Sequence, residues 1–145
     1  MTALLPDADE LVRHALAAGL AERGVPASLW TLWPDDWYGQ MPLVVARRVP
    51  GGAAPDPRGV DAAIITLTAC ASDRRAASLL ARQVRTVLYE QCTHQFADAG
   101  AGGYLHAFAE YAAPAEDRAP GPVLHADVFR FTATYRVITR PHPAS

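Results

Sequence analysis

The residues from Leu124 to Arg140, LHADVFRFTATYRVITR, alternate between apolar and polar side chains over most of their length. The apolar set consists of Phe129, Phe131, Ala133, Tyr135 and Val137. The polar set consists of Arg130, Thr132, Thr134 and Arg136. Because successive side chains of a strand point to opposite faces of a sheet, this alternation predicts one long β-strand. We expect it to be the central strand, with its aromatic face in the core.

The remaining chain divides into two helices and several strands. Asp7 and Glu10 form a capping-box pattern before an amphipathic helix that Gly24 and Pro26 end. We expect the side chains of Asp9 and Arg13, and of Glu10 and His14, to pair at i,i+4 spacing. Ser72 or Asp73 caps a second helix, whose predicted buried stripe is Ala76, Leu80, Val84, Val87 and Leu88.

The predicted strands lie around these helices. A short strand and a Pro-Asp-Asp turn occupy SLWTLWPDDWYGQMP, and further strands are expected at Leu43 to Val49, Val60 to Cys70 and Tyr104 to Ala112. If the long strand inserts between the last two, every neighbouring pair becomes antiparallel. The expected fold is therefore α+β: a single, mainly antiparallel sheet of four to five strands, with both helices packed on one face.

We expect one domain over residues 1–145, because a chain of 145 residues is long enough for one core. Proline and glycine mark flexible loops at about 50–59 and 113–122, and a short C-terminal tail covers 141–145. This topology puts the two loops at opposite ends of the sheet.

Composition excludes some classes of function. The net charge is −2, so no global basic field attracts nucleic acid or an anionic membrane. The apolar stretches are shorter than the ~20 residues of a membrane span, and no signal segment is recognisable, so we expect a soluble cytosolic product. Cys70 and Cys92 are then expected to be free thiols.

No residue pattern indicates chemistry. Cys92 and His94 are close in sequence, but His106 and His125 do not provide the second close pair that zinc sites usually have, so no metal is expected. Asp35 and Asp36 are adjacent and should diverge, which favours a turn over an acid/base pair. We expect no catalytic residue and no cofactor.

Three surfaces are candidates for partner contact. Arg75, Arg82 and Arg85 lie on the outward face of the second helix, where they are either solvated or meet a partner or a phosphate backbone. Trp37, with Trp30 and Trp33, either anchors an interface or plugs the end of the core. The third surface is the polar face of the sheet, which faces water or a neighbouring subunit; its residues are Thr66, Thr68, Arg130, Thr132, Thr134 and Arg136.

Nearly the whole chain resembles the tail terminator proteins of long-tailed phages. The resemblance rests on the opening helix DADELVRHAL, on DAAIITLTAC followed by DRRAASLLARQVRTVLYE, and on the closing FRFTATYRVITR. Head-to-tail connector subunits are similar in size and composition. No catalytic residue belongs to the family pattern.

The resemblance implies a virion structural protein of the tail or neck, assembled in the cytoplasm of the bacterial host. It implies a ring, usually of six subunits, that caps the tail tube, ends its polymerisation and offers a surface to the filled head. The implied partners are other copies of the chain, the major tail tube protein and a head-completion or connector protein, with DNA only passing through the lumen and no membrane. The alternatives are another connector of the neck, a small ligand-binding domain that uses Trp33 to Trp37, and a nucleic-acid binder that uses the second helix.

Overall fold

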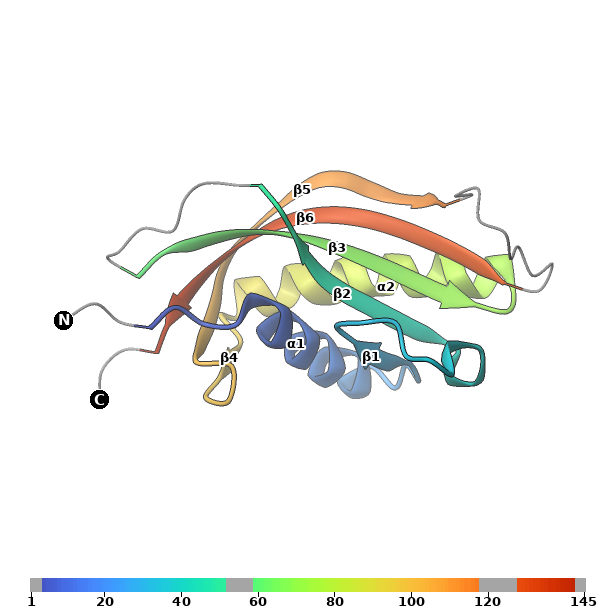
Figure 1. The fold of residues 1–145 in the computed structure, drawn as a ribbon, viewed down its shortest axis with the longest axis horizontal. Helices are drawn as coiled ribbons and strands as arrows, with labels where there is room; N and C mark the ends of the chain where they lie inside the picture. The colour runs from blue at the N-terminus through green and yellow to red at the C-terminus, as the bar shows by residue number, and fades with distance from the viewer. Residues whose placement is uncertain (1–3, 52–58, 118–127, 143–145) are drawn as a thin grey trace.

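The computed structural model describes residues 4–51, 59–117 and 128–142, which form one sheet with two helices beneath it (Figure 1). The helices are α1 (Ala8–Glu22) and α2 (Arg74–Thr93), with a short 3₁₀ helix η1 (Trp37–Gln40). The strands are β1 (Ser28–Trp30), β2 (Leu43–Val49), β3 (Asp61–Ala71), β4 (Ala97–Asp98), β5 (Gly103–Glu116) and β6 (Phe129–Pro141). Among the described residues, no helix is both long and apolar enough to cross a membrane.

The long strand is central, as predicted. The strand order is β1-β2-β3-β6-β5-β4, so β6 lies between β3 and β5 and is antiparallel to both. It begins at Phe129; of the predicted strand, Leu124 to Asp127 lie outside the described residues. The α+β class is confirmed.

The predicted number of strands and their uniform antiparallel pairing are wrong. The described residues form six strands, and β1 pairs with β2 in parallel, with Ser28 opposite Leu43. The segment after β1 turns back along the sheet before β2 begins, so the two strands run in the same direction. The sequence analysis did not predict β4, whose two residues pair with the start of β5.

The strand β5 is longer than predicted. It continues from Ala112 to Glu116, so residues 113–116 of the expected loop at 113–122 are strand, while 118–122 lie outside the described residues. Pro114 lies between Ala112 and Ala115, where the register with β6 shifts. Proline is tolerated at such irregularities and on edge strands because no ladder hydrogen bond is lost there. At the C-terminus, Pro141 belongs to β6 rather than to the expected tail.

The helix α1 begins where its cap was predicted, but only half of the capping box forms. The Asp7 carboxylate accepts from the Glu10 N–H at 3.2 Å, whereas the Asp7 N–H donates to the Ala101 carbonyl at 2.9 Å. The Glu10 carboxylate binds Arg13 instead, at 2.7 Å, and this hydrogen bond lowers the pKa of Glu10. The predicted Glu10–His14 contact forms at 3.3 Å.

The predicted pairing of Asp9 with Arg13 is wrong, because Asp9 is used in a tertiary contact. Its carboxylate accepts from the backbone N–H of Arg48 in β2 at 2.6 Å. The Arg48 guanidinium in turn binds the buried Asp61 carboxylate through two hydrogen bonds, of 2.7 and 2.9 Å. This network joins the start of α1 to the β2–β3 end of the sheet.

The helix α2 begins after Asp73, which accepts from the Arg75 N–H at 3.0 Å. Its buried stripe contains Leu80, Val84, Val87 and Leu88 as predicted, but Ala77 is buried in place of Ala76, which is exposed. Because Ala76 and Ala77 are adjacent alanines, the sequence did not determine which of them faces the core; in the fold it is Ala77.

One core lies between the sheet and both helices. It joins α1 and α2 to the apolar face of β6, where Phe131 and Tyr135 are buried, so both helices cover the same face. The helices approach closely at Gly19, beside Val87, and Gln91 of α2 donates to the Ala15 carbonyl at 2.8 Å. A second, smaller cluster lies on the opposite face, at the β1–β2 side; its residues are Leu43, Val45 and Cys70 with Trp30, Trp37, Met41 and Val128.

Candidate functional site

The polar face of the sheet forms as predicted. In the β3–β6 register, Thr66 lies opposite Thr134 and Thr68 opposite Thr132, so the four hydroxyls lie together. The Thr68 and Thr132 hydroxyl oxygens are 3.4 Å apart. The helices pack on the other face, which leaves these half-buried threonines uncovered by any described helix (Figure 1).

Arginines and alanines extend this face. Arg130 lies opposite Cys70 and Arg136 opposite Ile64, so the two guanidinium groups flank the threonines along β6. Neither arginine forms an ion pair with a described residue. On β5, the residues opposite Ile138, Arg136, Thr134 and Thr132 are all alanines: Ala107, Ala109, Ala112 and Ala115. The sequence analysis missed these alanines because bulges interrupt their period.

The predicted arginines of α2 separate into two environments. Arg85 turns towards the sheet and forms a two-pronged ion pair with Glu110 of β5, at 2.7 and 2.8 Å. Arg75 and Arg82 are exposed, and neither forms an ion pair within the described part of the chain. Arg82 only donates to the Ser78 carbonyl of its own helix, at 3.3 Å.

These two arginines belong to one exposed stripe on α2. Its members recur at spacings of three and four residues and are therefore neighbours on the helix surface. All are exposed, and we call them the α2 stripe: Arg75, Leu79, Arg82, Thr86, Tyr89 and Thr93. Tyr89 also makes an edge-to-face contact with Phe108 of β5, with ring centroids 5.8 Å apart.

The three tryptophans lie in two different environments. Trp30 and Trp37 are half-buried against the small cluster at Leu43 and Cys70. Trp33 is the exposed one, at 39%, and its ring meets Trp37 edge to face, with the centroids 6.1 Å apart. Trp37 therefore supports an exposed aromatic surface rather than forming its tip.

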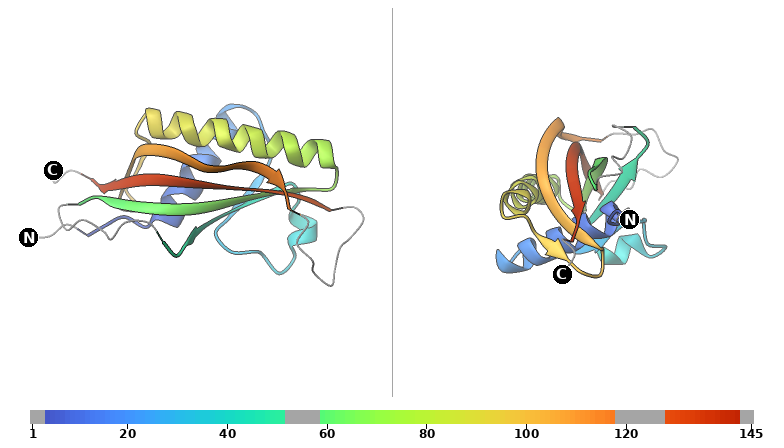
Figure 2. Two further views of the ribbon diagram at one scale, coloured as in Figure 1. Left: turned by 90° about the horizontal axis from the view of Figure 1, so that it is seen from above. Right: turned by 90° about the vertical axis from the view of Figure 1, so that its left-hand side faces the viewer.

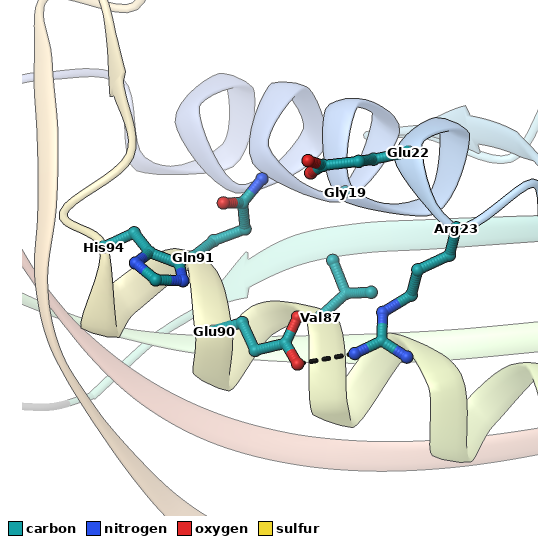
Figure 3. Close-up of a pocket in the computed structure, with 7 residues that line it drawn as sticks. All are labelled: Gly19, Glu22, Arg23, Val87, Glu90, Gln91 and His94. Atoms are coloured by element: carbon teal, nitrogen blue, oxygen red, sulfur yellow. Dashed lines mark hydrogen bonds and ion pairs between the residues drawn. The ribbon is translucent and has the colours of Figure 1, made fainter.

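Two surface hollows flank α1. The first, of about 330 Å³, lies between the end of α1 and α2, above Gly19 and Val87 (Figure 3). An ion pair of 2.5 Å between Arg23 and Glu90 crosses it. The second, of about 500 Å³, lies between Arg13 and Trp30. Neither is lined by Asp35 or Asp36, on which a ligand-binding role was weighed.

The thiols and imidazoles are dispersed. Cys70 and Cys92 are free and buried, and burial raises the pKa of the first to about 11 and of the second to about 12. Low-pKa thiolates are the reactive form, so these two thiols are inert in this fold. In the described part of the chain, no three His, Cys, Asp or Glu side chains gather into a metal site; His125 lies outside it.

Comparison with known proteins supplies what the residue chemistry does not. A family model described as phage tail termination protein matches residues 4–144. The chain belongs to this family. No curated protein matches it.

Membership of the phage tail termination family confirms the resemblance noted from the sequence. The family is one of structural proteins, and it places this tail termination protein in the virion tail. The interface roles of the predicted residues stay predictions; these residues are Arg75, Arg82, Arg85, Trp37, Arg130, Thr132, Thr134 and Arg136.

Proposed function

We propose that this tail termination protein acts as a single domain that forms a ring of six subunits on the end of the completed tail tube. The ring stops polymerisation of the tube and offers its other side to the head. Its partners are further copies of the chain, the major tail tube protein and a connector protein of the head, and DNA passes through the lumen. Assembly takes place in the host cytoplasm.

The family match across residues 4–144 carries this proposal. A ring that joins two different structures also needs two distinct axial sides and contacts between different surfaces around the circle. The sheet supplies two distinct ends. Because Asp61 pairs with Thr139 and Ala71 with Phe129, the β2–β3 and β5–β6 connections leave from opposite ends of the strands.

The uncovered sheet face gives the second support. A sheet covered by helices on one side only presents its other side to solvent or to another molecule. On β6 this face carries Arg130, Thr132, Thr134 and Arg136. These side chains offer hydrogen-bonding groups to a partner without giving the surface a high density of charge. We assign it to a neighbouring subunit or to the lumen of the ring.

Light scattering of the purified protein, alone and with the tail tube subunit, tests the proposal. The expected assembly has a mass close to six times the 15.5 kDa of one chain. A strict monomer at high concentration under both conditions would contradict the ring. A ring that binds the head connector but not the tube subunit would instead favour another connector of the neck.

A further inference from the structure

Exposed large apolar side chains gather in two groups. The first lies between β1 and β2 and consists of Leu32 (64% exposed), Trp33 (39%) and Tyr38 (52%). The second lies on α2 and β5 and consists of Leu79 (47%), Tyr89 (57%) and Tyr111 (57%). Of the described residues, only Leu4 among the exposed large apolar side chains falls outside both groups.

The two groups carry opposite charges. Asp35 and Asp36 are exposed within the first group, which we call the aromatic-acidic segment (Leu32 to Tyr38), and neither forms an ion pair with a described residue. The second group shares the α2 stripe with Arg75 and Arg82. The next arginines on that helix are already neutralised within the chain, because Arg74 pairs with Glu116 at 3.1 Å and Arg85 with Glu110.

The two groups also lie on opposite sides of the molecule. The aromatic-acidic segment follows β1, the strand at one edge of the sheet, whereas α2 packs against β5 near the other edge. Both views in Figure 2 show α2 on one flank and the segment after β1, in cyan, on the other. These flanks are distinct from the strand ends from which the β2–β3 and β5–β6 connections leave.

We propose that the aromatic-acidic segment of one subunit docks on the α2 stripe of the next, and that this contact closes the ring. The inference rests on the proposed ring and names its lateral interface. A heterologous contact requires two different, complementary surfaces on one chain, which these groups supply in both apolarity and charge. Trp33 and Tyr38 meet Leu79 and Tyr89, while Asp35 and Asp36 face Arg75 and Arg82 of the same stripe.

A charge-swap experiment tests the pairing. Variant one carries Asp35→Arg and Asp36→Arg, and variant two carries Arg75→Glu and Arg82→Glu. Alone, each variant brings like charges together at every contact, so each is expected to stay monomeric where the wild-type protein assembles. Mixed in equal amounts, they restore opposite charges at both kinds of contact, and an alternating ring of wild-type mass is expected.

Two variants test the apolar centre independently of the charges. Trp33→Ala and Leu79→Ala should each weaken assembly, and a hot-spot loss at Trp33 corresponds to roughly 30-fold or more in affinity per contact. Leu4→Ala is the matched control, because Leu4 is 90% exposed but lies outside both groups.

The measurements distinguish failure of this proposed interface from failure of the proposed ring. Mass is measured by light scattering, with the tube subunit present if the wild-type protein needs it. Near-ultraviolet circular dichroism checks folding, and in every variant except Trp33→Ala it also checks that the Trp33–Trp37 contact persists. If the wild-type protein forms no ring, the proposed function fails. If it forms a ring and each charge-swapped variant alone does so too, or if the mixture stays monomeric, the ring stands and this interface is wrong.

Discussion

The two helices pack closely at Gly19, where the effect of a Gly19→Ala substitution on stability depends on two opposing terms, the gain in helix propensity and the cost of overpacking. Gly19 lies inside α1, where replacing glycine by alanine ordinarily stabilises a helix by about 1 kcal/mol. Here the added Cβ would lie more than 1 Å closer to Val87 Cγ1 than the roughly 3.5–4.0 Å at which carbon atoms pack. It would also lie 3.3 Å from Gln91 Nε2.

The cost of overpacking is expected to exceed the gain in helix propensity. Forcing a methyl group into a packed site costs about 1–3 kcal/mol, and displacing Gln91 from the Ala15 carbonyl costs about 1 kcal/mol more. After the helix gain is subtracted, Gly19→Ala is expected to lower the free energy of unfolding by about 1–3 kcal/mol. Urea denaturation at fixed protein concentration measures this change.

A double-mutant cycle isolates the clash. In a Val87→Ala background the Cγ1 atom is absent, so Gly19→Ala should become close to neutral, with a coupling energy of about 1–3 kcal/mol. Gly39→Ala is the matched control, because nothing lies within 4 Å of its added Cβ, and a change within about 0.5 kcal/mol is expected. A Gly19→Ala variant that is more stable than wild type by about 1 kcal/mol would refute the reasoning.

Three further predictions concern buried polar groups, each measured by urea denaturation. Arg48→Ala leaves the buried Asp61 carboxylate unpaired and should cost about 3–5 kcal/mol, more than Asp61→Asn; equal costs would contradict this. Tyr135→Phe should not destabilise, because the buried hydroxyl has no hydrogen-bond partner among the described residues, whereas a loss above about 1 kcal/mol would reveal one. Burial raises the pKa of the Cys92 thiol to about 12, above the unfolded value of about 8.5. The contribution of this protonated thiol to the free energy of unfolding is therefore fully present below pH about 8.5 and is lost as pH rises towards about 12. Cys92→Ala should therefore flatten the loss of stability between pH about 8 and about 10, and an unchanged slope would oppose this.

The parts of the fold with a strong sequence period were predictable. The alternation around Phe131 and Tyr135 identified the central strand and its buried face, and the residues before each helix identified its cap. Strands of two or three residues carry no period, so β4 and the parallel pairing of β1 depend on tertiary packing. Proline at position 114 indicated a loop, but the bulge at the edge of the sheet accommodates it.

The candidate surfaces were predictable as faces but not as individual contacts. The sequence placed the four threonines on one face, and the β3–β6 register brings them together by pairing Thr66 with Thr134 and Thr68 with Thr132. Which arginine stays unpaired depends on β5, since Glu110 reaches Arg85 but not Arg82. Helical spacing also gives the α2 stripe, yet its complement after β1 becomes visible only when the fold shows that Trp33, rather than Trp37, is exposed.

Polymerisation of the tail tube subunit in the presence of this protein tests the central claim most directly. Tube length is measured by electron microscopy while this protein is added during elongation. The account predicts that growth stops, that tubes stay at the length they had reached, and that a ring is visible at the capped end. Tubes that continue to lengthen with no density added at their ends would contradict it.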